Sequence, residues 1–116
     1  MANELFISLQ VTFAKNNAAY ARSGGGSVTI TGSRFTSAVQ NVGTSEEALA
    51  LGEVPVGGYL LVHNMDATNY VELGETGAPV MKLKAGEWMI CRWTGTAPYA
   101  KANTAACNVE YFIVED

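Results

Sequence analysis

The chain has 116 residues and a net charge of −4, with 16% charged residues against 48% hydrophobic ones. This length and composition predict one folded domain and exclude a disordered segment. The seven basic residues are scattered, which argues against binding to nucleic acid, and no apolar stretch is long enough for a membrane span. The low charge leaves two interpretations: a surface that a neighbouring subunit covers, or a small, mildly hydrophobic domain.

The first predicted element is a long strand over residues 5–13, because every second position is apolar. Its apolar residues, which we take as candidate subunit contacts, are Leu5, Ile7, Leu9, Val11 and Phe13. One face of this strand is expected to be buried. Residues 18–27 end in Gly24–Ser27 and are expected to form a flexible connection. Residues 1–26 are therefore either the first strand and loop of the domain, or an extended arm that contacts other subunits as an exchanged or added strand.

Further strands are predicted at Ser27–Thr31 and Phe35–Val42, where β-branched and apolar residues alternate. Residues 44–51 are the one candidate helix, with Thr44 as cap and Glu47 as its capping-box partner, although this segment can also be extended. A two-turn helix would end at Gly52.

The second half of the chain reads as strands separated by turns and by loops at residues 54–58 and 95–98. Residues 69–73 are expected to return as the hairpin partner of 59–64. The pattern predicts an all-β fold over residues 1–116, a single-domain antiparallel β-sandwich or barrel of jelly-roll type with at most one short helix. The predicted strands of this half are 59–64, 69–73, 80–84, 87–93, 99–102 and 109–114.

No combination of residues indicates an enzyme, a cofactor or a metal site. His63 is the only histidine, and we expect it to end a strand and bond to the following turn. The segment Asp66–Asn69 is expected to be a turn held by its own side chains and not a calcium loop. Cys91 and Cys107 are read as small buried residues with free thiols, since we expect no secretory signal, and a disulfide is the alternative.

Two tryptophans lie five positions apart on one predicted strand, so they point to opposite faces. Trp88 shares a face with Ile90, and Trp93 shares one with Met89. One tryptophan is expected to face outward as an anchor for a partner subunit, or as a platform for a sugar. The alternative is that both are buried in a closed barrel or sandwich.

Five further segments occur in a fixed order along about two-thirds of the chain: Val42–Gly52, Gly58–Gly74, Leu83–Glu87, Tyr99–Asn103 and Val109–Asp116. Taken together in this order, they resemble a group of small virion proteins of tailed bacteriophages.

This resemblance implies a non-enzymatic structural protein of the virion, made in the host cytoplasm. The leading hypothesis is a capsid cement (decoration) protein that bridges subunits of the shell, with the major capsid protein or other virion subunits as partners and with self-association into a homo-oligomer. The alternatives are a tail, connector or fibre-associated component, and a carbohydrate-binding β-sandwich.

Overall fold

The computed structural model describes residues 3–55, 57–94 and 97–116, and these ranges contain ten strands and no helix. The all-β class predicted from the sequence is confirmed. The described residues accordingly include no helix that is long and apolar enough to cross a lipid bilayer. Parts of the predicted loops at 54–58 and 95–98 lie outside this description. The chain divides into two compact units, Met1–Thr31 and Gly32–Asp116, which are treated separately below.

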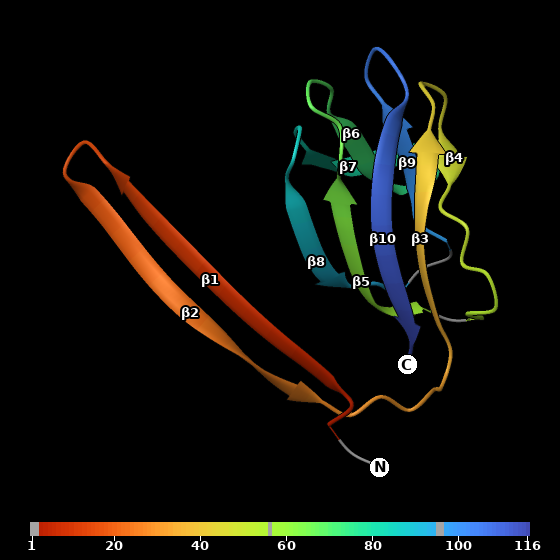
Figure 1. Cartoon of the computed structure of the whole chain (residues 1–116), viewed down its shortest axis with the longest axis horizontal. Helices are drawn as coiled ribbons and strands as arrows, with labels where there is room; N and C mark the ends of the chain where they lie inside the picture. Colours follow the sequence, from red (N-terminus) through yellow and green to blue (C-terminus); the bar gives the residue numbers. More distant parts are fainter. Residues whose placement is uncertain (1–2, 56, 95–96) are drawn as a thin grey trace. The chain divides into compact units, whose positions relative to one another are not determined.

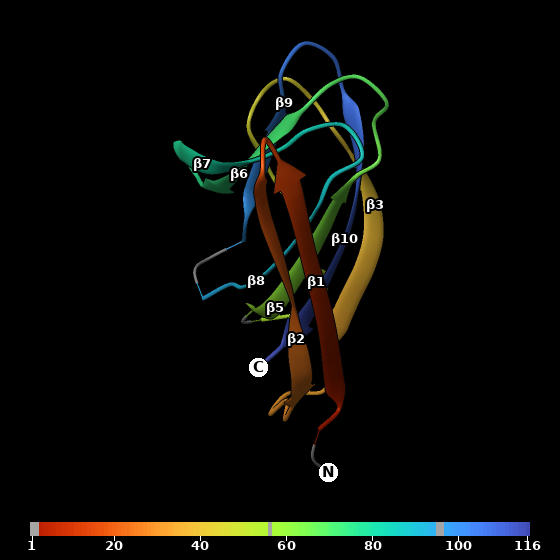
Figure 2. The same ribbon diagram turned by 90° about the vertical axis from the view of Figure 1, so that its left-hand side faces the viewer.

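The first unit is an antiparallel hairpin of β1 (Leu5–Lys15) and β2 (Ala18–Val28), paired along their whole length (Figure 1). Asn16 and Asn17 form its turn with φ angles of 50° and 68°. Positive φ at both residues is what a two-residue hairpin turn requires, and asparagine tolerates it well. The hairpin is a long ribbon of two strands and no third (Figure 2).

The strand predicted at 5–13 is confirmed, but the flexible connection predicted at 18–27 is wrong. Pairing with β1 orders this segment as a strand, and β2 also takes the first two residues of the separate strand predicted at Ser27–Thr31. Gly25 has a φ of 146°, and a Cβ there would run into the backbone oxygen of Ile7. Glycine is therefore required at this position by the hairpin itself.

The second unit is a sandwich of two four-stranded antiparallel sheets (Figure 1). Its strands pair as nested hairpins, β3 with β10, β4 with β9, β5 with β8 and β6 with β7, which is the arrangement of a jelly roll. One sheet has the order β3-β10-β5-β8 and the other the order β4-β9-β6-β7. The strands are β3 (Phe35–Val42), β4 (Glu47–Ala48), β5 (Gly57–Asn64), β6 (Val71–Glu75), β7 (Ala78–Leu83), β8 (Trp88–Arg92), β9 (Tyr99–Ala102) and β10 (Cys107–Glu115).

The core lies between the two sheets and is filled by alternate residues of the strands. On β10, the positions from Cys107 to Ile113 alternate between buried and outward, as a pleated strand requires. This final strand is central in its sheet, between β3 and β5. The most buried core side chains are Val42, Leu49, Leu60, Val62, Val71, Leu73, Val109 and Ile113.

The helix predicted at 44–51 is wrong, and the extended alternative is right. The side chain of Gln40 donates to Glu47 Oε1 and to the Ala48 carbonyl, at 3.0 and 2.9 Å, and its Oε1 accepts from the Ala50 amide at 3.1 Å. A two-turn helix is too short to be stable by itself. The contacts of Gln40 and the burial of Leu49 in the core outweigh the local helix signals.

The hairpin predicted between 59–64 and 69–73 is also wrong, because β6 lies in the opposite sheet and pairs with β7 and β9. The segment 65–70 is a connection from one sheet to the other. Asn64, fully buried at the end of β5, holds this crossing together. Its Nδ2 donates to the carbonyls of Asn69, Leu83 and Lys84 at 2.9, 3.1 and 3.2 Å, and its Oδ1 accepts from the Asp66 amide at 3.0 Å.

Candidate interaction surfaces

The hairpin carries apolar side chains on one face, since directly opposed residues of an antiparallel pair share a face. The candidate contacts predicted on β1 lie on this face together with Tyr20 and Val28 of β2. We call it the hairpin face; its members are Leu5, Ile7, Leu9, Val11, Phe13, Tyr20 and Val28. The opposite face holds mainly small and polar residues, with Phe6 as the exception.

Within the hairpin unit by itself, this face is not buried as expected. Leu9, Val11, Phe13 and Tyr20 are each at least 50% exposed. The sheet of this unit has two strands, and isolated two-stranded hairpins are only marginally stable in water. Within its own unit, the hairpin face is therefore an exposed apolar surface.

A second apolar surface lies on the outside of the sheet β3-β10-β5-β8. Ser37, Phe112, Leu61 and Ile90 are opposed in one row across the four strands. The rings of Phe35 and Phe112 are in contact, with centroids 5.7 Å apart. We call this surface the outer sheet face; its apolar members are Phe35, Val39, Leu61, Trp88, Ile90, Phe112 and Val114.

The outer side of a two-layer sandwich is usually polar, because it faces water. Here Phe35, Val39 and Trp88 are each more than 50% exposed. Among these residues, only Trp88 is a contact predicted from the sequence. The signal in the sequence for this surface was that β5 and β10 carry apolar residues on both faces. One face of each strand fills the core, and the apolar residues of the other face remain on the outside.

His63 and Glu110 form a polar part of the outer sheet face, next to Trp88. The rings of His63 and Trp88 stack in parallel, with centroids 3.8 Å apart and an angle of 6°. His63 Nδ1 lies 3.1 Å from Glu110 Oε1 on the neighbouring strand, and it carries the proton in this pair because a carboxylate only accepts. The expectation that His63 bonds to the following turn is wrong; its side-chain contacts run across the sheet.

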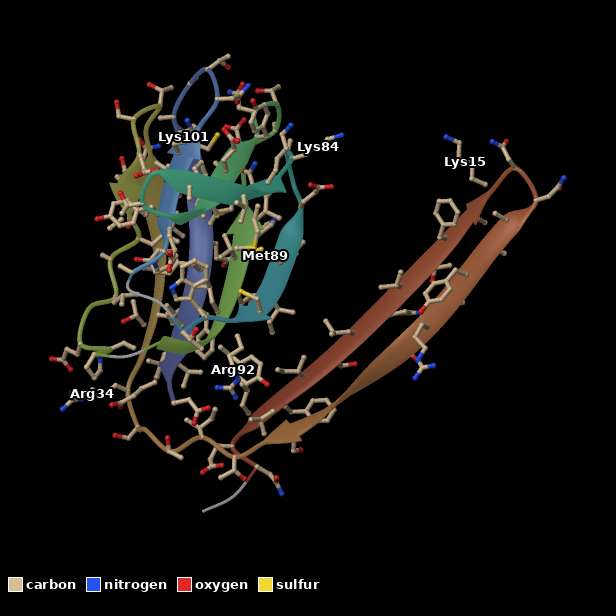
Figure 3. All side chains as sticks on the ribbon, turned by 180° about the vertical axis from the view of Figure 1, so that it is seen from behind. Lys15, Arg34, Lys84, Met89, Arg92 and Lys101 are labelled. Carbon is tan, nitrogen blue, oxygen red and sulfur yellow. The ribbon has the colours of Figure 1, made fainter. Side chains whose placement is uncertain are left out.

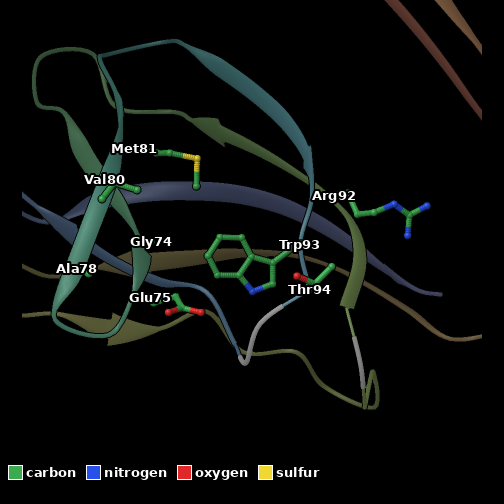
Figure 4. A pocket seen from close by; sticks show the side chains of 8 residues that line it. All are labelled: Gly74, Glu75, Ala78, Val80, Met81, Arg92, Trp93 and Thr94. Carbon is green, nitrogen blue, oxygen red and sulfur yellow. The ribbon is translucent and has the colours of Figure 1, made fainter.

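Trp93 lies on the other side of the sheet from Trp88, as predicted. It is half-buried and packs against the core together with Met89 and Cys91. Figure 3 shows Arg92, the preceding residue, on the outside. Trp93 also lines an open depression of about 430 Å³, shown in Figure 4 with the other lining residues Gly74, Glu75, Ala78, Val80, Met81, Arg92 and Thr94.

The two cysteines are far apart in the second unit. Cys91 is opposed to Leu60, Leu60 to Ile113, and Ile113 lies six residues beyond Cys107 on β10. Six residues of a strand span about 20 Å, whereas a disulfide needs Cα atoms within roughly 7 Å. Both thiols are free, and burial raises the pKa of each above its ordinary value.

The turn at Asp66–Asn69 has the predicted self-bonded form. Asp66 Oδ2 accepts from the amides of Thr68 and Asn69, at 3.0 and 2.6 Å, and from the Thr68 hydroxyl at 3.2 Å. These hydrogen bonds, the one from the Asn69 amide first, lower the pKa of the Asp66 carboxyl below its ordinary value. No group of three or more potential metal-binding side chains occurs in the described part of the chain.

We expect Asp66→Asn to make the sandwich less sensitive to acid. Because the folded state lowers the pKa of Asp66, its ionised form stabilises the fold above about pH 4, the unfolded value, and this contribution is lost as the pH falls through the folded value. Urea unfolding at pH 7 and pH 3 measures the effect. The variant should be less stable than the wild type at pH 7 and should lose less stability between the two values. An equal loss in both proteins would contradict this role.

Comparison of the chain with protein-family models, with curated proteins and with solved structures gives no match. The two apolar surfaces and the sequence features described above are therefore the features of this protein that bear on its function.

Proposed function

We propose that this protein is a structural subunit of a bacteriophage virion, and that it acts as a capsid cement protein by packing across junctions between capsid subunits. The observation that carries the proposal is the outer sheet face, an exposed apolar surface on a sandwich whose core is already complete. Exposed apolar patches of this kind mark sites of protein association. The resemblance of residues 42–116 to small virion proteins supports the choice of a phage particle as the partner.

The mechanism of such a protein is passive. A subunit that binds the closed shell, and not its dissociated parts, stabilises the shell by mass action. The outer sheet face provides large aromatic side chains, Trp88, Phe35 and Phe112, and aromatic anchors are frequent among the residues that dominate binding energy. Such a role needs rigid, complementary surfaces and no chemical step.

Location and copy number on the particle test this proposal. We expect antibody labelling and microscopy to find the protein on the outside of the head in hundreds of copies, and particles that lack it to release their DNA at a lower temperature. A dozen copies or fewer at the tail or connector would favour the tail or fibre alternative. Absence from purified particles would contradict a virion role altogether.

One observation favours the carbohydrate-binding alternative. The depression beside Trp93 combines part of an indole ring with the Glu75 carboxylate and the Thr94 hydroxyl, and aromatic rings with adjacent polar groups suit sugars. Binding in a glycan screen that Trp93→Ala abolishes, while Trp88→Ala leaves it intact, would support this function.

A further inference from the structure

The chain carries two exposed apolar surfaces of different shape, and each lies on a different compact unit. The hairpin face is a narrow ribbon, and the outer sheet face is four strands wide. Two apolar β layers stack face to face at about 10 Å to form a sandwich. A hairpin stacked on the outer sheet face would therefore make the same kind of face-to-face contact as the two sheets of the jelly roll make with each other.

Two glycines on the hairpin face indicate that another molecule approaches closely. Gly24 and Gly26 lie opposite Leu9 and Ile7, and a Cβ added at either glycine would meet nothing within 4 Å. Unlike Gly25, neither is required by the conformation of the hairpin. Glycine in a strand often marks a place where a ligand or another backbone comes close. The bare backbone leaves room beside Ile7 and Leu9 for large side chains of a partner.

Charge favours an association between the two units. Residues 1–31 contain Lys15, Arg22 and Glu4, which gives a net charge of +1. Since the whole chain has a net charge of −4, the remaining 85 residues have a net charge of −5. Arg22 lies on the hairpin face itself, opposite Val11. On the outer sheet face, Glu110 lies between Val39 and His63, and the charge of Arg92 on the same face is paired with Asp116 at 2.8 Å. The net charges of the two units are therefore opposite, which favours association of a hairpin with a sheet over association of two hairpins.

We infer that the hairpin face of one copy of this chain docks on the outer sheet face of a second copy, and that the two copies exchange hairpins reciprocally. The inference extends the proposed structural role by naming a partner and a surface, but it concerns the free protein in solution.

The size of the contact agrees with reciprocal exchange. An 11-residue strand is about 36 Å long and a two-stranded ribbon about 10 Å wide, so one docked hairpin buries about 700 Å² over both partners. Specific interfaces bury roughly 1,200–2,000 Å². One docked hairpin falls short of this range, whereas two bring the dimer to about 1,400 Å².

The connection between the units also favours exchange between copies. The amides of Ser33 and Arg34 both donate to Glu115 Oε2, at 3.1 and 3.2 Å, which fixes the chain at the end of β10. Only Thr29–Gly32 remain between this point and β2. Short connections favour exchange of an element between copies.

Since the ribbon is two strands wide, about half of the outer sheet face stays free for a capsid subunit.

Sedimentation and light scattering of the purified full chain, without any particle, test the inference. We expect a dimer at micromolar concentration. Because the substitution stands in both contacts of a reciprocal dimer, Leu9→Asp should weaken dimerisation by about 1,000-fold, which corresponds to twice the ~2 kcal/mol of one central contact residue. Gln10→Asp places the same charge on the opposite face of the hairpin and should leave the dimer intact. On the sheet, Val39→Asp should weaken the dimer, whereas Val80→Asp, on exposed β7 of the other sheet, should not.

Substitution of the two glycines tests the inference in another way, because it should favour the hairpin strand but weaken the dimer. Replacing Gly24 and Gly26 together by valine adds apolar surface and strand propensity to the hairpin. The dimer should nevertheless weaken, because the new side chains fill the space that the partner occupies. Valine at Ser23 and Ser27, on the opposite face, is the matched control and should have no such effect.

Mixing two variants distinguishes docking on the sheet from pairing of hairpins. The Leu9→Asp chain keeps an intact outer sheet face, and the Val39→Asp chain keeps an intact hairpin face. A mixture can form one contact in which both surfaces are intact, so it should associate more strongly than either variant alone, although more weakly than the wild type. A wild-type protein that stays monomeric at 100 μM, or a mixture that associates no more strongly than the separate variants, would overturn the inference. Because no particle is present, either result would leave the virion role to be decided by copy number.

Discussion

Asn64→Ala should lower the free energy of unfolding of the sandwich by about 3–5 kcal/mol, although the substitution removes no apolar contact. The two N–H groups of the Asn64 side chain are shared among three carbonyl groups, and its Oδ1 accepts from one amide, at the crossing from β5 to the opposite sheet. The Lys84 carbonyl also accepts from the Glu87 amide, so the substitution deprives mainly the Asn69 and Leu83 carbonyls and the Asp66 amide. Each buried polar group that is left without a partner costs about 1–3 kcal/mol. The Leu83 carbonyl, at a fully packed position, is the group least able to turn to water.

Urea unfolding of the purified variant measures this loss. Asn108→Ala is the matched control, because Asn108 is exposed on the same sheet and its Oδ1 accepts one hydrogen bond, from Asn41 Nδ2 at 3.0 Å. An exposed substitution of this kind should change stability by about 0.5 kcal/mol or less. Similar losses in the two variants would show that Asn64 does not connect the sheets energetically.

Tyr111→Ala should destabilise the sandwich by about 3–5 kcal/mol, as large-to-small core substitutions of aromatic residues do. Tyr111 lies on the central strand β10, is 2% exposed and belongs to the core cluster. Its hydroxyl donates to the Ala50 carbonyl at 2.6 Å, which ties the segment after β4 to the opposite sheet.

Tyr111→Phe separates packing from hydrogen bonding. It keeps the ring and removes the hydroxyl, so we expect a loss of only about 1 kcal/mol, the typical net value of one hydrogen bond. Both variants are compared with the wild type by urea unfolding. A loss below about 0.5 kcal/mol for Tyr111→Ala, the usual range of surface sites, would be incompatible with a core position.

Some elements could be predicted from the sequence because their signals are local. The alternation in residues 5–13, 35–42 and 109–114 is visible in each segment alone, and all three are strands. The opposite orientations of Trp88 and Trp93 follow from their spacing. The turn at Asp66 also depends only on neighbouring residues, whose amides bond to its carboxylate.

Other predictions failed where distant residues decide the conformation. Gln40 holds the segment after Glu46 extended, and pairing with β1 orders the glycines of β2. The two-residue turn at Asn16 and Asn17 was the signal for that hairpin, since asparagine accepts the positive φ of both positions. When the pairing with β1 is not known, three successive glycines indicate a flexible segment.

The sequence by itself determined where most strands run, though not β2 or β4, and which residues of a strand share a face, because period-two alternation belongs to each strand alone. Only the tertiary structure decided which strands pair, and which of two apolar faces fills the core. β5 and β10 are apolar on both sides, and the closure of the jelly roll buries Leu60 and Ile113 while leaving Leu61 and Phe112 on the outer sheet face. Which face is buried depends on how all eight strands of the sandwich pack together, and this information is not present in the sequence of any single strand.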